Sequence, residues 1–216
     1  MPAYSKLRDI LRERIITGVI PADSRLTIAE IALEHGVSHM PVREALQWLQ
    51  GEGLLEIIPN KGARVLRLDA EFIGSVYDTR SVVEGLLART ALANLTEDDR
   101  SKIERAHAAF LDAAAGLDID TVYTRNREFH LALYSKSRNR PGLDIYNKYS
   151  ALLLTLREKF GFGVGRVNAM VDQHDQILSA IRAGSAEKLA EITQLHAQGG
   201  KNDLLSRMQM TMQSTL

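Results

Sequence analysis

The stretch from Thr27 to Leu49 constrains the fold of this chain more than any other part of its sequence. Thr27 and Glu30 have the spacing of a capping box, in which a hydroxyl and a carboxylate satisfy free amides where a helix begins. Gly36 can adopt the left-handed conformation that ends this short helix, and Ser38 follows as the N-cap of the next one. Two helices joined by such a tight turn are typical of a helix-turn-helix.

The second of these helices has one apolar face. Pro41 suits its first turn, where a missing N–H needs no partner. The apolar positions recur at i, i+3, i+4 and i+7, and they are Val42, Ala45, Leu46 and Leu49. Gly51 and Gly53 then end the helix. Because the apolar residues occupy one face, the opposite face is available for other contacts.

The flanking segments complete a winged form of this motif. A helical pattern covers residues 5–16, and two β-prone runs, Leu55–Ile58 and Ala63–Leu68, enclose a Pro-Asn-Lys-Gly turn at residues 59–62. The order of three helices and a hairpin predicts a winged helix-turn-helix domain over residues 1–68.

After residue 69 the β-prone runs disappear and helical patterns take over. Six of them are expected, at about 70–94, 97–115, 119–136, 143–159, 167–183 and 186–209. Six helices of this length can bury a core of their own. We therefore expect a mainly α protein, in which an all-α six-helix bundle over residues 69–216 follows the winged domain.

The overall charge is balanced, because 27 basic and 27 acidic residues are present. Nucleic-acid binding would therefore have to come from a local group of side chains. The absence of cysteine excludes disulfides and thiolate metal ligands. The N-terminus resembles no secretory signal, and no apolar run reaches the roughly 20 residues of a membrane span, so we expect a cytoplasmic protein with no membrane partner.

Candidate DNA-reading residues lie on the exposed face of the helix after Ser38. His39, Arg43 and Gln47 are spaced at i, i+4 and i+8. In a helix-turn-helix this helix enters the major groove, where Arg43 could bind guanine through two hydrogen bonds and Ser38 could bind a phosphate.

Lys61 and Arg64 of the hairpin would contact phosphate or the minor groove. The alternative is an ordinary solvated face, and charge does not decide between them, because residues 1–68 contain nine basic and eight acidic side chains.

A family resemblance favours DNA binding. The run Val37-Ser38-His39-Met40-Pro41-Val42-Arg43-Glu44-Ala45-Leu46, with Leu49, Glu52-Gly53-Leu54 and Pro59-Asn60-Lys61-Gly62-Ala63, resembles the reader domain of GntR-type transcription regulators. The resemblance implies that Ser38, position 39, Arg43 and Gly62 contact an operator in double-stranded DNA. His39 stands where the family usually has arginine, and an imidazole cannot offer the same forked pair of donors. A different operator base or weaker binding is expected.

Three histidines in the second half suggest a metal site. Asn126 and His130 share a helix face, and His174 and His196 would lie at similar heights on two antiparallel helices. Three imidazoles and one oxygen suit a divalent ion such as zinc, nickel or manganese. Each histidine alone is more often a packed or surface residue than a ligand.

The second half also resembles the FCD ligand-binding domain of the FadR branch of GntR regulators. The run Asn126-Arg127-Glu128-Phe129-His130, the segment Gln173-His174-Asp175 and Leu195-His196 carry this resemblance. It implies that residues 126, 130, 174 and 196 hold a metal whose shell is completed by water or an effector carboxylate. Asn126 replaces the usual aspartate, so the metal would bind less tightly and keep its full charge, which favours an anionic effector.

Arg80 and Glu84 are spaced at i, i+4 in the first helix of this half. They could form a weak surface ion pair, or, as the family resemblance implies, Arg80 could grip an effector carboxylate in the cavity. Tyr77, one turn earlier, is a further candidate on the same wall.

The combined expectation is a homodimeric regulator, more often a repressor in this family, whose operator affinity is controlled by a small carboxylate. One alternative is a metal-dependent hydrolase or hydratase that uses the three histidines, although no catalytic triad or carboxylate pair can be identified near them in the sequence. A helical interaction module is a second alternative.

Overall fold

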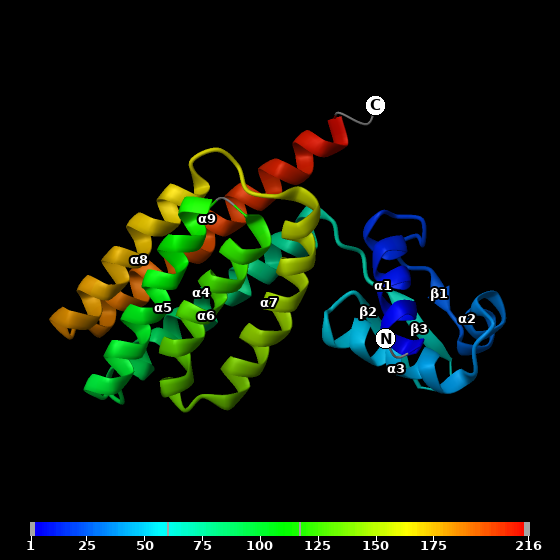
Figure 1. Ribbon diagram of the computed structural model, residues 1–216, viewed down its shortest axis with the longest axis horizontal. Helices are drawn as coiled ribbons and strands as arrows, with labels where there is room; N and C mark the ends of the chain where they lie inside the picture. Colours follow the sequence, from blue (N-terminus) through cyan, green and yellow to red (C-terminus); the bar gives the residue numbers. More distant parts are fainter. Residues whose placement is uncertain (1–2, 60, 117, 214–216) are drawn as a thin grey trace. The chain divides into compact units, whose positions relative to one another are not determined.

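The computed structural model describes residues 3–59, 61–116 and 118–213. Two compact units divide the chain, Met1–Phe72 and Ile73–Leu216 (Figure 1). The first is a small mixed unit and the second is built from helices. The predicted winged helix-turn-helix followed by an all-helical bundle is confirmed.

The first unit combines three helices with a small antiparallel sheet. Its elements are α1 (Ala3–Ile16), β1 (Arg25–Leu26), α2 (Ile28–His35), α3 (His39–Gly51), β2 (Leu55–Ile58) and β3 (Gly62–Val65). The strand order is β1-β3-β2, and Ala63 of β3 lies opposite Leu26 on one side and Ile57 on the other. The predicted hairpin is present, but β3 ends at Val65 rather than Leu68, and β1 was not predicted. Asn60, in the expected turn, lies outside the described residues.

Local side-chain chemistry sets the helix ends in this unit. Thr27 Oγ1 accepts a hydrogen bond from the Glu30 amide at 3.2 Å and donates one to the Glu30 carboxylate at 2.6 Å. Gly36 is left-handed, with φ 63°. Ser38 occupies the N-cap of α3, but its side chain makes no capping hydrogen bond. Its hydroxyl is therefore not used inside the helix.

The apolar face of α3 is buried as its sequence pattern predicts. Val42, Ala45, Leu46 and Leu49 are at most 2% exposed. Because this face packs into the core, the opposite face of α3 stays exposed.

The second unit consists of longer helices that lie alongside one another (Figure 1). They are α4 (Ala70–Leu92), α5 (Glu97–Gly116), α6 (Ile119–Tyr134), α7 (Arg140–Phe160), α8 (Arg166–Ala183) and α9 (Ala186–Gln213), with a 3₁₀ turn η1 (Ser135–Ser137) after α6. The helix α5 packs against α6 and α8, α6 packs against α7, and α9 packs against α8 and α7.

Caps and turns mark the helix ends of this unit. Asp118 caps α6 by accepting a hydrogen bond from the Thr121 amide at 3.1 Å. Asn139 caps α7 in the same way through the Gly142 amide. Gly184, with φ 66°, lets the chain reverse between α8 and α9. This reversal places His174 and His196 on neighbouring antiparallel helices.

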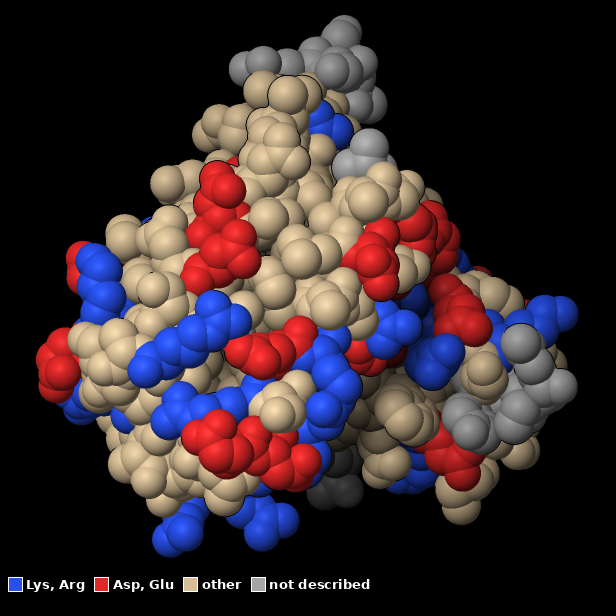
Figure 2. Space-filling view, turned by 60° about the vertical axis from the view of Figure 1, so that its left-hand side comes forward, with Lys and Arg blue, Asp and Glu red and all other residues tan. Residues whose placement is uncertain are grey.

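Charges of both signs are interleaved on the face of the molecule that Figure 2 presents, in keeping with the balanced sequence. Among the described helices, none combines the length and apolarity that a membrane crossing requires.

Candidate functional site

Three histidines from three helices converge inside the second unit. His130 comes from α6, His174 from α8 and His196 from α9, and one ring nitrogen of each lies within 4.8 Å of those of the other two. All three side chains are buried, with exposed fractions of 5% or less. Clusters of buried titratable side chains are typical of functional sites, so this group is the candidate for a metal site.

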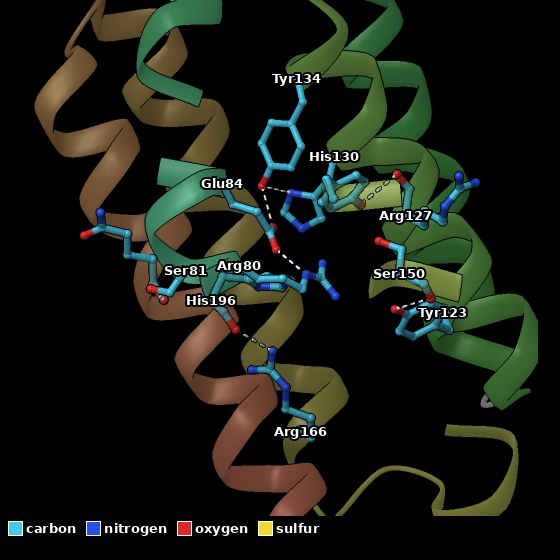
Figure 3. A network of polar contacts seen from close by, with 12 residues as sticks. Arg80, Ser81, Glu84, Tyr123, Arg127, His130, Tyr134, Ser150, Arg166 and His196 are labelled. Atoms are coloured by element: carbon cyan, nitrogen blue, oxygen red, sulfur yellow. Dashed lines mark hydrogen bonds and ion pairs between the residues drawn. The ribbon is translucent and has the colours of Figure 1, made fainter. Parts of the chain in front are cut away.

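Tyr134 fixes the proton on His130. Its hydroxyl donates to Glu84 Oε2 at 2.9 Å, so its oxygen is left to accept a hydrogen bond from His130 Nδ1, 3.0 Å away (Figure 3). His130 Nδ1 therefore carries the hydrogen and Nε2 carries the lone pair. This Nε2 is buried and has no hydrogen-bond partner among the described residues.

Gln173 performs the same task for His196. Its Oε1 lies 3.0 Å from His196 Nδ1 and also accepts a hydrogen bond from Arg166 Nη1 at 3.2 Å. Because this oxygen can only accept, His196 Nδ1 donates and its Nε2 keeps a lone pair. Two of the three rings are thus held in the tautomer that leaves Nε2 available as a ligand.

His174 contacts Asn126 and a wall of aromatic rings. Its Nε2 lies 3.1 Å from Asn126 Oδ1. The imidazole stacks on Phe129, with ring centroids 4.1 Å apart and planes inclined by 24°. Its Nδ1 is buried and has no hydrogen-bond partner in the described part of the chain.

Burial keeps these imidazoles neutral. Burial, reinforced by the positive charges of Arg80 and Arg166, lowers the pKa of His130 to about 3. Burial also lowers the pKa of His174 and of His196 well below the ordinary value. A neutral imidazole is the form that binds a metal. Buried polar atoms normally have a partner, and the lone pair of His130 Nε2 has none among the described residues, so this atom is available as a metal ligand. The residues present therefore fit a divalent ion.

A small cavity of about 40 Å³ adjoins the cluster. Its lining residues include the three arginines Arg80, Arg157 and Arg166, together with Tyr77, Glu84, Tyr123, Asn126, His130 and His196. Figure 3 shows Arg80 and Arg166 approaching this region from α4 and α8. The excess of guanidinium groups over carboxylates around this cavity favours an anionic occupant.

Arg80 and Glu84 form an ion pair of 2.6 Å, but their side chains are only 9% and 1% exposed. The interpretation as a surface pair is therefore wrong, and the pair lies inside the bundle. Burial is the largest influence on the pKa of Arg80 and acts to lower it, but Glu84 and three neighbouring tyrosines together hold that pKa well above the ordinary value. Tyr77, 4% exposed, lines the same cavity as Arg80.

Two glycines in the interior of α9 make room for cavity residues. A Cβ on Gly199 would lie 2.7 Å from Arg166 Nη1, and a Cβ on Gly200 would lie 3.0 Å from the ring of Tyr77. Glycine inside a helix costs about 1 kcal/mol relative to alanine, so this pair trades helix stability for close approach.

Sequence reasoning missed Arg157, Arg166, Tyr134 and Gln173. A usable signal existed for Tyr134, because it follows His130 by four residues and therefore shares its helix face. The adjacent glycines of α9 also pointed to close packing at this level of the bundle.

The candidate DNA-reading residues lie on and beside α3. Ser38, His39, Arg43 and Gln47 are exposed, and Arg43 has no ion pair among the described residues. A cleft between α3 and the hairpin is lined by Arg43, Gln47, Lys61 and Gly62, but not by Ser38 or His39.

Two of the predicted wing contacts also have structural roles. Arg64 donates to Glu56 across the hairpin at 3.0 Å. Gly62 has φ +90°, and a Cβ there would lie 2.1 Å from the carbonyl oxygen of Leu26. Arg25, which sequence reasoning did not select, lines the same cleft and donates to the Lys61 carbonyl at 2.7 Å.

Each of the two units matches a known protein family or domain. Residues 3–65 match the group described as bacterial regulatory proteins, gntR family, and residues 75–199 match the FCD domain. The second match alone spans more than half of the chain.

Named relatives extend over nearly the whole chain. The gluconate operon transcriptional repressor of Bacillus licheniformis is 29% identical over 213 residues, which cover 93% of this chain and 85% of that protein. The transcriptional repressor RspR of Escherichia coli (strain K12) is 23% identical over 197 residues, or 91% and 86% of the two chains. The solved structure of Lar, which controls expression of the Listeria monocytogenes agr system, has the same fold, with a TM-score of 0.72 at 18% identity over 95% of this chain and 98% of Lar.

Proposed function

Because the chain belongs to the GntR family of bacterial regulatory proteins and carries an FCD domain, we propose that it is a repressor whose affinity for operator DNA is set by a small organic acid. The naming of two relatives as repressors supports this direction of control. The family consists of transcriptional regulators, so the hydrolase alternative has no support and is not retained. A regulator of transcription acts where the DNA is, in the cytoplasm.

The convergence of three neutral histidines beside a cationic cavity is the observation that carries the effector part of the proposal. His130, His174 and His196 hold a divalent ion, zinc, nickel or manganese, together with Asn126 Oδ1. When bound, the ion supplies a Lewis-acidic position for a carboxylate oxygen. Tyr134 and Gln173 orient two of the imidazoles, an outer contribution that ligands at metal sites generally require.

Arg80 and Tyr77 form one wall of the effector site in this proposal. The guanidinium of Arg80 lies with its centre 5.0 Å from the ring of Tyr146 and is bonded to Glu84, so its position is fixed before any ligand arrives. A group that is held in place loses little entropy on binding.

DNA reading is assigned to the winged domain, residues 1–68. Arg43 and Gln47 of α3 line the cleft beside the hairpin, which supports a role for their side chains in contacting base edges in the major groove. Ser38 and His39 contact DNA at the leading end of the helix, and Lys61, Gly62 and Arg64 lie along the wing. An imidazole at position 39 predicts a base preference that differs from that of arginine.

Dimerisation is assigned to the helical domain, residues 69–216. Ser81 Oγ donates to the Gln194 carbonyl, and Gly85 lets Gln194 approach closely, so α4 and α9 meet here. Val82, Leu86 and Leu195 flank this contact and are 67%, 38% and 54% exposed. A homodimer would cover such side chains and present two reader helices to a palindrome.

Control of DNA binding requires that the acid bind one arrangement of the two reader domains more tightly than another. A difference of about 1–3 kcal/mol is enough to matter. The proposal needs no new contact between acid and DNA.

Metal content provides the first test. Protein purified without chelator is expected to contain about one divalent ion per chain by elemental analysis, because the four donors converge. His174→Asn and His196→Asn should lose it, and His39→Asn, in the other domain, should retain it. Equal metal content in all four proteins would contradict the assignment.

A further inference from the structure

Arg166 differs from the other cations around the cavity. It is 8% exposed, and among the described residues it has no carboxylate within ion-pair distance. Two of its nitrogens donate to neutral oxygens, Nη2 to the His196 carbonyl at 3.0 Å and Nη1 to Gln173 at 3.2 Å. Its Nε is buried and has no hydrogen-bond partner in the described part of the chain.

The two neighbouring arginines are already neutralised. Arg80 is paired with Glu84. Arg157 is paired with Asp203 Oδ2, and the second oxygen of that carboxylate accepts from the Gly163 amide at 2.9 Å. Asp203 thus pairs with Arg157, and the described residues include no ion pair between Asp203 and Arg166. A buried charge without a carboxylate partner is costly to the fold.

The helix opposite Arg166 is adapted to it. Gly199 lies in the interior of α9, and a Cβ there would meet Arg166 Nη1 at 2.7 Å. Two unfavourable features therefore lie side by side: the helix-interior glycine Gly199 and the guanidinium of Arg166, which has no carboxylate partner. The hydrogen bonds of Arg166 hold it in place but leave its charge without a carboxylate, which points to an anionic ligand.

Formal charges around the cavity indicate the ligand's charge. Three guanidinium groups and the carboxylates of Glu84 and Asp203 leave a charge of +1. A divalent ion held by neutral histidines and Asn126 would raise this to about +3. A ligand with a single negative charge would leave much of this charge uncompensated.

We propose that Arg166 receives one carboxylate of a short dicarboxylate whose other carboxylate is held at the three-histidine site. This inference rests on the proposed function and names the class of its effector. The unpartnered Nε and the planar fork of a guanidinium suit a carboxylate. A cavity of about 40 Å³ restricts the ligand to a short chain.

Calorimetric titration of the full-length protein with malonate and with acetate tests the inference. The titrations are made on zinc-loaded and on chelator-stripped protein. Zinc-loaded wild-type protein should bind malonate at least about tenfold more tightly than acetate. Arg166→Gln should weaken malonate binding by about tenfold or more, because a charged hydrogen-bonded contact is lost. Zinc content should be unchanged.

Arg182→Gln is the matched control, because Arg182 lies on the same helix with a side chain 66% exposed and paired with Glu104. It should bind malonate as the wild type does. Gly199→Ala is a second variant that crowds Arg166 without removing it, and it should also weaken malonate binding. It covers the case in which Arg166→Gln fails to fold.

The outcomes separate this inference from the proposed function. If Arg166→Gln and Gly199→Ala both bind malonate as tightly as the wild type, the proposed role of Arg166 is overturned, whatever the result for the metal. Equal affinity for malonate and acetate on zinc-loaded protein would overturn the ligand class. If Arg166→Gln weakens malonate binding equally in loaded and stripped protein, the role of Arg166 stands and the metal part of the proposed function fails.

Discussion

The hydroxyl oxygen of Tyr134 lies 3.0 Å from Nδ1 of His130. Because the hydroxyl hydrogen is donated to Glu84, and Glu84 also accepts from Arg80 Nε at 2.6 Å, one unbroken chain of hydrogen bonds joins Arg80 to His130 (Figure 3). The residue proposed to face the acid is therefore connected to a proposed metal ligand through two side chains.

Replacing Tyr134 with phenylalanine removes the acceptor that holds the His130 proton on Nδ1. We expect Tyr134→Phe to lower zinc affinity by about 10–100-fold, the usual effect of losing an outer contact to a ligand. Competition with a chromophoric chelator measures this affinity. Tyr149→Phe, on α7 and outside the chain of hydrogen bonds, should behave as wild type, and an unchanged affinity in Tyr134→Phe would refute the orienting role.

Arg43 is expected to provide most of the base discrimination of α3. After an operator is selected from a random duplex pool, Arg43→Ala should lose about 1–3 kcal/mol of binding to it in a gel-shift titration. Gln50→Ala, also exposed on α3 but away from the cleft, is the control. Full operator binding by a folded Arg43→Ala protein would count against the DNA-reading assignment.

Gly62 is required by the backbone of the wing. Gly62→Ala should destabilise the protein by more than about 1 kcal/mol, because φ is +90° and the new Cβ would meet the Leu26 carbonyl. Gly51→Ala places a Cβ in open space at the end of α3 and should be neutral or stabilising. Urea unfolding compares the two, and equal stabilities would show that the wing backbone is not constrained as described.

Asp99 gives the stability of the protein an acid-sensitive component. Lys136, 2.7 Å away, and the hydroxyl and amide of Thr96 lower the pKa of Asp99 to about 2. Since the unfolded chain holds this proton more tightly, the contribution is complete above about pH 4 and is lost as the pH falls from there toward 2.

Asp99→Asn should therefore lose less of its unfolding free energy than wild type between pH 5 and about pH 3. Urea unfolding at several pH values measures the difference. Asp112→Asn, exposed on the same helix, should follow the wild type. If Asp99→Asn also followed the wild type, the ion pair with Lys136 would not contribute to acid sensitivity.

The elements that were predictable from the sequence depend on local chemistry. Thr27, Gly36 and Asp118 act within a few residues of themselves, so the helix ends that they mark could be identified directly. The strand β1 has two residues and exists because Leu26 meets Ala63 far along the chain. No local pattern of that length distinguishes a strand from a loop.

The candidate site was predictable only in its most specific residues. His130, His174 and His196 were selected by spacing and resemblance, and the structure brings them together. Whether Arg80 and Glu84 face solvent or the core depends on which neighbours cover α4, which spacing cannot reveal. Arg166 stands 30 residues from the carbonyl that it contacts, so its role depends on the packing of α8 against α9.

The central claim is that the site in the helical domain controls the affinity of the winged domain for DNA. Its most direct test is the dissociation constant of the selected operator, measured by fluorescence polarisation with full-length protein in four conditions, with and without zinc and with and without malonate. The account predicts a change of at least about fivefold when both are present, retained in Arg182→Gln and lost in Arg166→Gln. An operator affinity that stays the same in all four conditions would contradict it.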